Sequence, residues 1–541
     1  MSASGIYGLS GSGIDVESMV KMGMMSKQNE YDKMYKKQVK NEWTKEAYAN
    51  IYSDLQTFNN SKMSSYKLSS KTMPMGVSSS DTGVVTATAN ANAAAMSHTL
   101  EVKSLASNAY LLTKDKITRL PVTNDDGTPK ESKSIYLSDI IDTSNWGDDD
   151  SISLTVGDGG SDTKEIKLTK EQIVTNKQTL NDLAAAFKNA GLNITASYDA
   201  TNDAFTIYNK EGGSENTISI TANNDDSKKL MTALGLASVT TDYSSGSPKT
   251  TIGEPLDFVN GDAKQEVKGT DAEVIIDGKT YKPTSNKISV SNVTYSISAV
   301  GTSTLTVSQD TDAVIESVKS FVEDYNKMLD SLNDKYSETT YSDYDVLTQS
   351  QEKSMTTDQI DKWNEKAKSG LLYHDENLSK LISAMREAIY TPVDSVDSKY
   401  NSMMSIGITS SNTKGHLTLD EDKLKKALAE DPDCVYQLFA SSGDVTDANG
   451  KSTTDYNKEG VVNRIYDAVS TNMKTMKDYA GTTSEGGDGS TLGTLISELQ
   501  TKMSNFKKMM DSYEDILYKK YDAMETAITQ LSASYNYISG S

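Results

Sequence analysis

A heptad repeat of apolar residues near the C-terminus constrains the fold of this chain more than any other feature. Its members are Leu492, Ile496, Leu499, Met503, Phe506, Met510, Tyr513, Leu517, Tyr521, Met524, Ile528, Leu531, Tyr535 and Ile538. They alternate in steps of four and three, with a single double step of four at residues 513–521. This spacing is typical of a coiled coil with one stutter. At about 1.5 Å per residue, the helix reaches on the order of 70 Å, too long to be packed inside one domain.

The N-terminal region carries a second long helical pattern. Residues 14–70 contain no proline and no glycine after Gly23, and aromatic or apolar residues recur at near-helical spacings. Ser12 and Asp15 are placed to cap this helix, behind a lead-in that contains Gly8, Gly11 and Gly13. Methionine, tyrosine and glutamine stand where leucine would be expected. Two interpretations stay open: the helix finds its partner only in a particular assembly, or it is an ordinary amphipathic helix against the C-terminal one.

We predict that the two terminal helices form a coiled-coil leg. The residues predicted to make its contacts are Ile14, Val20, Tyr31, Tyr35, Leu492, Ile496, Leu499, Met503, Phe506, Met510, Tyr513, Leu517, Met524, Ile528, Leu531 and Tyr535. The polar seam, the stutter and two glycine-rich segments, at 8–13 and 481–490, favour a leg that can shift its register.

The middle of the chain has β character. Short alternating runs occupy 75–117 and 251–310, and Asp277-Gly278 is a strong hairpin signal. Residues 118–250 interrupt these halves. They contain a helix capped by Thr179 and Asp182 and stopped at Gly191, followed by an alternating hairpin. We therefore expect a head domain with an inserted outer α+β domain.

Helical patterns return from residue 311, with a small hairpin before a helix that Asp420 caps. The predicted fold class is a multi-domain α+β protein with a terminal-helix coiled-coil leg, a helical bundle domain with a small β-hairpin, and β-rich head domains. The predicted segments are 1–45 (N-terminal leg), 46–74 (helix of the bundle), 75–117 (head, first part), 118–250 (outer head), 251–310 (head, second part), 311–480 (bundle with hairpin) and 481–541 (flexible joint and C-terminal coil).

The composition argues against several classes of protein. The chain has 54 Lys and Arg against 76 Asp and Glu, a formal net charge of −22, which disfavours sequence-independent binding to nucleic acids and to anionic membranes. No apolar run has the length of a membrane span, and no cleaved export signal is recognisable. Cys434 is the single cysteine, so an intrachain disulfide is impossible. We expect either a cytosolic protein or one that is exported without a cleaved signal.

No catalytic, cofactor or metal site is predicted. His98, His374 and His416 lie far apart without ligand spacing and are expected at isolated surface or turn positions. The acidic pairs are interpreted as solvated turns and helix caps, because 76 acidic residues produce such neighbours by chance. The Asp and Asn residues around Gly127, Gly159 and Gly278 lack the spacing of an EF-hand; loose surface calcium sites stay open.

Several segments, in order, resemble the flagellar hook-associated protein 2 family of filament cap proteins. They are GLSGSGIDVESMV (8–20), SGLLYHDENLSKLISAMREAI (369–389) and, with the most specific pattern, IGITSSNTKGHLTLDEDKLKKALAEDPDCVYQLF (406–439). Residues 179–236 resemble a repeat in the outer domains of flagellin-like proteins. The first helix departs from the family by its methionines, and His374 stands where a glycine is common.

The resemblance implies a concrete function. Members of the family pass unfolded through the flagellar export channel, gather as a ring at the filament tip and hold incoming flagellin while it folds into the lattice. The implied partners are other copies of the chain, flagellin, the export apparatus and a dedicated chaperone, and host surface glycans or mucin for the outward-facing head. The implied location is extracellular, at the filament tip, without nucleic acid or membrane insertion.

Two alternatives remain. A flagellin or a hook-filament junction protein also pairs its two ends, and a secreted adhesin would use the acidic head for binding. An enzyme is disfavoured because no convergent site is recognisable.

Overall fold

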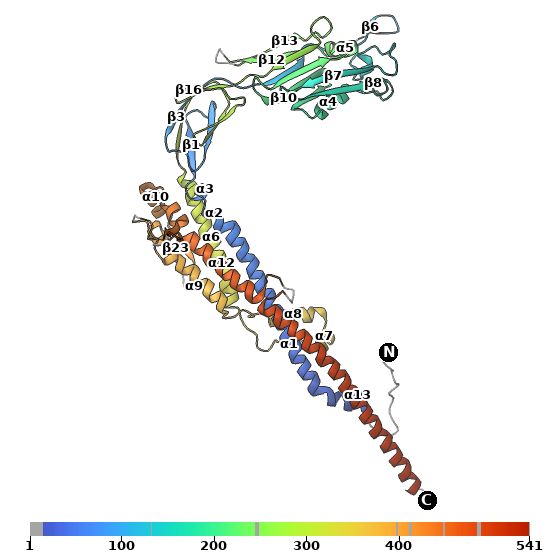
Figure 1. Ribbon diagram of the computed structural model, residues 1–541, viewed down its shortest axis with the longest axis vertical. Helices are drawn as coiled ribbons and strands as arrows, with labels where there is room; N and C mark the ends of the chain where they lie inside the picture. Colours follow the sequence, from blue (N-terminus) through green and yellow to red (C-terminus); the bar gives the residue numbers. More distant parts are fainter. Residues whose placement is uncertain are drawn as a thin grey trace. The chain divides into compact units, whose positions relative to one another are not determined.

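The computed structural model describes residues 15–539, except 131, 244–247, 397–398, 411–413, 447–449 and 484–487 (Figure 1). The chain divides into two compact units. The helical unit combines the residues up to Met73 with those from Thr311 onward, and the β unit is Pro74–Asp310. The predicted fold class is confirmed, since helices of the two chain ends and a helical bundle form one unit and β-rich domains form the other.

The first helix, α1 (Val16–Thr57), begins at a cap that the sequence supplies. The Asp15 carboxylate accepts a hydrogen bond from the Ser18 backbone N–H at 3.0 Å, which satisfies a donor that the first turn would leave free. The helix continues through a π-helical turn, η1 (Phe58–Met63), into α2 (Ser64–Tyr66), and α3 (Ser69–Thr72) follows separately. The prediction of one helix over 14–70 is corrected at this end. Ser12 and Gly8–Gly13 lie outside the described residues.

The π-helical turn coincides with a polar contact between helices. Asn59 is buried, and its Nδ2 donates to the Tyr466 carbonyl at 3.2 Å and to Ser470 Oγ at 2.8 Å. Both acceptors belong to α12 (Val461–Ala480). A π turn inserts one extra residue into a helix, and here it carries the amide that binds α12.

One hydrophobic core joins α1 to the helices that follow the β unit. These are α6 (Thr311–Tyr336), α9 (Glu376–Tyr390), α10 (Glu421–Glu430), α11 (Cys434–Ala440), α12 and the first turn of α13 (Thr491–Ser539). Leu55, Phe321 and Phe439 are among its fully covered members. The predicted small hairpin is present as β20 (Ile408–Ser410) and β21 (Leu417–Leu419), after the short η4 (Met403–Ile406). Asp420 caps α10, as expected.

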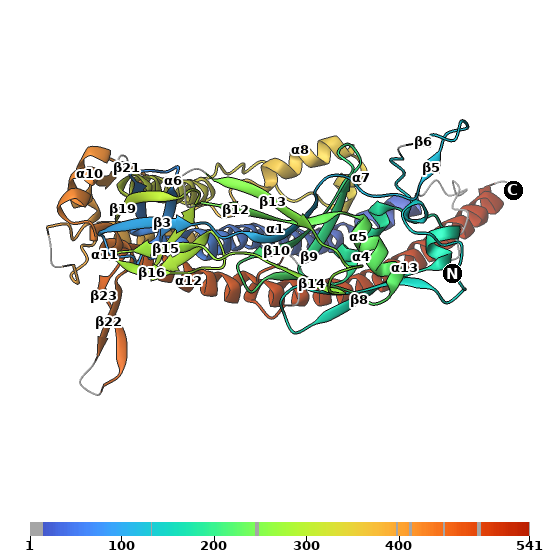
Figure 2. The same ribbon diagram turned by 90° about the horizontal axis from the view of Figure 1, so that it is seen from above.

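The helical unit also contains elements that the sequence patterns did not predict. Helices α7 (Gln349–Lys353) and α8 (Thr357–Lys368) bury none of their residues and contain few apolar ones, so the apolar signal by which helices are recognised is weak in both. Strands β22 (Ser442–Thr446) and β23 (Ser452–Glu459) are largely polar and form a hairpin that extends away from α11 and α12 in Figure 2.

The β unit has an inner part built from both halves of the predicted head. A five-stranded sheet has the order β1 (Met75–Ser79), β19 (Gly301–Gln309), β3 (Ser97–Ser104), β15 (Glu273–Ile276) and β16 (Lys279–Tyr281). A three-stranded sheet has the order β17 (Lys287–Val290), β18 (Val293–Ile297) and β2 (Val85–Ala89). The predicted hairpin is present, because Asp277 and Gly278 have φ values of 49° and 82° between β15 and β16.

The outer part of the β unit has two sheets and two principal helices. The first sheet has the order β13 (Lys249–Pro255), β12 (Leu236–Asp242), β4 (Asn108–Thr113), β10 (Ala204–Gly212) and β9 (Ile194–Asp199). The second sheet has the order β14 (Lys264–Lys268), β11 (Thr217–Ala222), β7 (Ser151–Gly157) and β8 (Thr163–Thr169). The helices are α4 (Leu180–Asn189), with the predicted Thr179–Asp182 capping box, and α5 (Asp225–Ala233). Short elements are β5 (Val122–Thr123), β6 (Pro129–Lys130), η2 (Leu137–Asp139) and η3 (Glu171–Thr175).

Strand pairing corrects the predicted limits of the outer domain at 118 and 250. Strand β4 pairs with β10 and β12, β13 pairs with β12, and β14 pairs with β11. These segments belong to the outer part because their side chains are buried there: Ala109, Leu111 and Phe258 lie in the same hydrophobic core as the side chains of α4. The outer sheets therefore include strands on both sides of the predicted insertion.

Candidate functional site: the paired terminal helices

Helices α1 and α13 lie side by side in opposite directions. Val16 and Val20, near the start of α1, form a small hydrophobic cluster with Leu517. Leu492, at the start of α13, belongs to the bundle core that contains Tyr48 of α1. The two chain ends therefore meet in one antiparallel pair, here called the terminal coil.

The predicted contact residues are not all brought together. The buried ones are Val20, Leu492, Ile496, Met503, Met510 and Leu517. Partly exposed ones are Tyr31, Tyr35, Leu499, Phe506, Met524 and Ile528, and exposed ones are Tyr513, Leu531 and Tyr535. Ile14 lies outside the described residues. After Leu492, the buried positions recur every seven residues from 496 to 517, so α1 buries one line of the predicted seam. It covers the other line only in part, for example where Lys27 Nζ lies 5.8 Å from the Phe506 ring centroid.

The narrow contact follows from the sequence of α1. Between Val20 and Lys45 this helix has no fully buried residue, because its apolar positions are interrupted by polar ones. Gly23 permits a close approach: a Cβ atom there would stand 2.7 Å from Leu517 Cδ1. Tyr35 lies beside Glu352 of α7, and burial, followed by the charge of Glu352, raises the pKa of its hydroxyl.

A buried lysine ties the terminal coil to the bundle. The Lys45 side chain is fully covered, and its Nζ donates to the Ala480 carbonyl at 2.6 Å and to Asp488 Oδ2 at 2.5 Å. Asp488 Oδ1 accepts from the Ser490 backbone N–H at 3.1 Å. Burial alone would raise the pKa of Asp488, but the hydrogen bonds from Lys45 and Ser490 lower it below its ordinary value.

This contact lies at the ends of the predicted joint at 481–490, whose flexibility stays a prediction. A Cβ atom on Gly481 would stand 1.8 Å from Asp488 Oδ2, and one on Gly493 would stand 2.3 Å from Asp488 Oδ1. The glycines at these two positions therefore leave room for the carboxylate, and Asp488 is anchored at the end of the joint; residues 484–487 lie outside the described part. The sequence signal for this contact was Lys45 itself, a charged residue close to the apolar positions Tyr48 and Ile51 of the same helix.

A groove of about 590 Å³ runs between the two helices near the start of α1. Its lining combines methionines with charged side chains: Met24, Met25, Met510, Lys21, Asp511 and Glu514. Methionine side chains are flexible and polarisable and adapt to differently shaped partners. The groove is therefore a surface suited to contact, without the convergent polar groups that fix a small substrate.

The segment with α7 and α8 contacts the outer side of α1. Lys36 and Asp345 form an ion pair at 3.0 Å, and Glu46 and Lys368 form another at 3.1 Å. Lys368 Nζ also lies 5.3 Å from the Trp43 ring centroid. These charges are partly exposed, and such pairs contribute little each, so the segment is held by several weak contacts.

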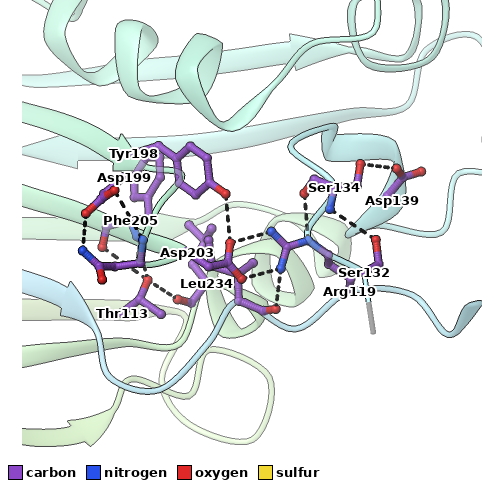
Figure 3. A network of polar contacts seen from close by, with 12 residues as sticks. Thr113, Arg119, Ser132, Ser134, Asp139, Tyr198, Asp199, Asp203, Phe205 and Leu234 are labelled. Carbon is purple, nitrogen blue, oxygen red and sulfur yellow. Dashed lines mark hydrogen bonds and ion pairs between the residues drawn. The ribbon is translucent and has the colours of Figure 1, made fainter. Parts of the chain in front are cut away.

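A polar network around Arg119 lies in the outer part of the β unit. Figure 3 shows that the Arg119 guanidinium donates to both carboxylate oxygens of Asp203, at 2.7 and 2.6 Å, and that the Tyr198 hydroxyl also donates to Asp203. The hydrogen bonds from Arg119 lower the pKa of Asp203, against the effect of burial. This bidentate pair fastens the outer part of the β unit.

The histidines differ in part from the expectation of isolated positions. His98 is buried and its Nδ1 lies 2.7 Å from Asp277 Oδ2, while His416 Nε2 lies 2.5 Å from Asp330 Oδ1. His374 stacks on Tyr373 in a turn. The carboxylates come from distant parts of the chain, which sequence spacing does not reveal.

The described part of the chain contains no group of three His, Cys, Asp or Glu residues that could hold a metal ion. Its helices, as far as the structure describes them, include none that combines the length and apolar character of a membrane span. The Cys434 thiol is buried, and burial raises its pKa to about 12.

The fold and the site define a multi-domain α+β protein whose two chain ends build one helical unit around an inserted β unit. Residues 12–109 match the family model for the flagellar hook-associated protein 2 N-terminus, and residues 269–533 match that for its C-terminus. The chain belongs to the flagellar hook-associated protein 2 family.

The chain is also similar to individual proteins. The chain is 26% identical over 554 residues to flagellar hook-associated protein 2 of Halalkalibacterium halodurans, covering 97% of each chain. It is 24% identical to the Salmonella typhimurium protein over 59% of this chain and 61% of the relative. A crystal structure of the flagellar cap protein FliD D1-D2-D3 domains from Escherichia coli is similar with a TM-score of 0.46 and 21% identity, covering 80% of this chain and 95% of that one.

Proposed function

We propose that this chain is a structural cap at the tip of a bacterial flagellar filament, where several copies assemble and promote the insertion of exported flagellin. The observation that carries the proposal is the match of both chain ends to the family, combined with the pairing of those ends in one terminal coil. An extracellular location follows from the same function. Flagellin, the export apparatus and a dedicated chaperone are the partners that this function requires.

The terminal coil supports a mechanism for such a cap. A cap must stay bound while the vacancy beneath it moves with each added subunit, so its contacts have to exchange. Between Val20 and Lys45 the α1 helix contributes no fully buried residue, and elements with few buried apolar contacts open locally at low cost. The Lys45–Asp488 pair holds the other end of α13 to the bundle. We infer a leg that is fixed at the bundle and adjustable toward the chain termini.

The functional division of the chain follows from this proposal. The terminal coil is the leg, and the predicted contact residues that α1 does not cover are candidates for filament contacts. The β unit is the head, with the outer limits that strand pairing gives. Binding of host glycans or mucin by the head stays a prediction from the family resemblance.

The proposal is tested by deleting the gene in its flagellated host and returning it on a plasmid. We expect the deletion to release monomeric flagellin into the medium and to leave filaments absent or stunted, and we expect the plasmid to restore them. Unchanged filaments after deletion would refute the cap function. The purified chain should form small closed rings, whereas a flagellin would form long fibres.

A further inference from the structure

The α13 helix carries a second, more exposed apolar line beside the line that packs on α1; at its edge, Lys27 Nζ of α1 lies 5.8 Å from the Phe506 ring centroid. This second line is here called the outer stripe and consists of Leu495, Leu499, Phe506, Met509, Tyr513 and Ile516. With Lys502 and Lys520 included, its members alternate in steps of four and three from 495 to 520. This is the spacing of a helix seam. We propose that the outer stripe binds an acidic amphipathic helix of a partner protein.

The exposure of the outer stripe distinguishes it from the line beside it. Leu495, Met509 and Ile516 are 39%, 43% and 58% exposed, whereas Ile496, Met503, Met510 and Leu517 are buried. Single exposed apolar residues are normal on protein surfaces. Several on one face, at the spacing of a seam and over about 30 Å of helix, mark a surface for association.

The charge of the outer stripe selects the kind of helix that fits. Lys502 and Lys520 stand in line with the apolar residues, 18 positions or about 27 Å apart. Neither lysine forms an ion pair within the described part of the chain. The acidic Asp511 and Glu514 instead line the groove toward α1. Glu498 lies near one end of the outer stripe and Lys519 near the other, so its net charge remains positive.

A partner helix must therefore present an apolar seam and carboxylates opposite the two lysines. Lysines within the seam choose partners through charge, because a basic partner would be repelled and an acidic one attracted. The inference rests on the proposed function and deepens it, since it names the face of the leg that meets a partner and the chemistry of that partner.

The test uses the purified full-length chain and two synthetic helical peptides as probes. Both peptides are 28 residues long with the same leucine seam, and they carry either glutamate or lysine at the flanking positions. Binding is measured by fluorescence anisotropy at two salt concentrations. We expect the glutamate peptide to bind at least about fivefold more tightly than the lysine peptide, with a smaller ratio in high salt.

Variants locate the binding face. The triple variant Leu495→Gln, Met509→Gln, Ile516→Gln should lose at least about tenfold in affinity for the glutamate peptide, because it removes the apolar contact. The matched control Ser504→Gln, Ser512→Gln, Thr526→Gln changes three exposed polar positions of the same helix and should bind as the wild type does. The double variant Lys502→Glu, Lys520→Glu should bind the lysine peptide more tightly than the glutamate peptide. Circular dichroism of each variant checks that α13 remains folded.

Equal binding of both peptides, or full binding by the triple variant, would overturn the proposal. The proposal would also be overturned if a second copy of this chain occupied the outer stripe. In that case, light scattering would show an oligomer of the wild-type chain that is lost in the triple variant, and the glutamate peptide would not break up the wild-type oligomer. Complementation of the gene deletion separates this inference from the proposed function. Normal filaments with the triple variant refute the outer stripe alone, whereas unchanged filaments after deletion of the gene refute the cap function.

Discussion

Lys45 shows how a single side chain fixes the geometry of the helical unit. A buried ammonium group is costly unless it is paired and hydrogen-bonded, and here a carbonyl of α12 and a carboxylate before α13 supply both conditions. The lysine belongs to α1. One side chain therefore joins three helices from the two ends of the chain.

Removal of the Lys45 cation should destabilise the helical unit. Lys45→Met leaves the Ala480 carbonyl and the Asp488 carboxylate without their shared donor, and we expect a loss of about 3 kcal/mol in the free energy of unfolding. Urea unfolding followed by circular dichroism measures it. Lys36→Met is the control, because the Lys36–Asp345 pair is partly exposed and its loss should cost under about 1 kcal/mol. If both variants lost the same free energy of unfolding, burial of Lys45 could not be the reason for its effect on stability.

Two glycines near the Lys45–Asp488 contact are expected to differ in their tolerance of alanine. Gly481 and Gly489 have φ values of +76° and +80°, and the ψ of −172° at Gly481 lies in a region that essentially only glycine adopts. A Cβ atom on Gly489 meets nothing within 4 Å, whereas one on Gly481 would overlap Asp488 Oδ2. Backbone strain and this overlap both lead us to expect that Gly481→Ala lowers the unfolding free energy more than Gly489→Ala, measured by urea unfolding. Equal losses would contradict both effects.

At the scale of elements, the junction of β23 and α12 contains a buried carboxyl group that titrates near neutral pH. Burial, with a contribution from the nearby Asp467, raises the pKa of Glu459 to about 7. The folded protein therefore holds this proton more tightly than the unfolded chain, whose pKa is near the ordinary value of 4.5. The stabilisation is complete below pH 4.5 and is lost as the pH rises to 7.

Glu459→Gln should remove this pH dependence. At pH 8 the variant avoids a buried charge, so we expect it to be more stable than the wild type by roughly 1–3 kcal/mol, and at pH 4.5 the two proteins should be equally stable. Thermal unfolding across this pH range measures the difference. Glu430→Gln is the control: the hydrogen bond from Lys399 lowers the pKa of Glu430, so this variant should not change the slope between pH 5 and 7. If the stability of Glu459→Gln changed with pH in the same way as that of the wild type, the pH dependence could not be assigned to Glu459.

The elements that could be predicted are those whose pattern is local. The Thr179–Asp182 capping box, the Asp277-Gly278 turn and the Asp420 cap are short-range signals, and each appears in the structure. Helices α7 and α8 were missed because α7 has no apolar residue and α8 has only Ile360, Trp363 and Ala367 at helical spacing. Their capping boxes at Thr348 and Thr356 were the remaining signal.

The heptad repeat of α13 could be predicted from the sequence, but which of its residues contact α1 could not. Periodicity places Leu499, Phe506 and Tyr513 on the same seam as Ile496 and Met503. Which line is buried depends on the partner, and α1 presents a narrow, polar surface that buries one line. The Lys45–Asp488 pair depends in the same way on residues that tertiary structure alone brings together.

At the scale of the whole molecule, the helical unit requires both ends of the chain. Tyr48 and Leu492 belong to one core although the β unit separates them in sequence. Contacts of such long sequence separation form late in folding, because closing the loop costs entropy before they are made. The helical unit can therefore fold only after the C-terminal helix is available, which fits the proposal that the chain is exported before it folds.

The last turns of α13 allow the leg to be tested apart from the fold. Beyond Tyr521 the apolar residues Leu531, Tyr535, Tyr537 and Ile538 are exposed, with Tyr535 at 72%. Truncation after Tyr521 keeps the Val16, Val20 and Leu517 cluster, so we expect the unfolding free energy to change by less than about 0.5 kcal/mol. If these turns contact the filament, the truncated gene should fail to restore filament growth in the deletion host.

A pair of full-length variants separates loss of helix from loss of apolar contact. Leu531→Ser with Tyr535→Ser should reproduce the stunted filaments, because both side chains are removed while the helix remains. Gln530→Ser with Ser532→Ala changes the adjoining polar positions and should restore normal filaments, measured as filament length by electron microscopy. Full-length filaments with Leu531→Ser and Tyr535→Ser would mean that the end of α13 acts through its helix or not at all, and the filament contact would then have to lie closer to the bundle.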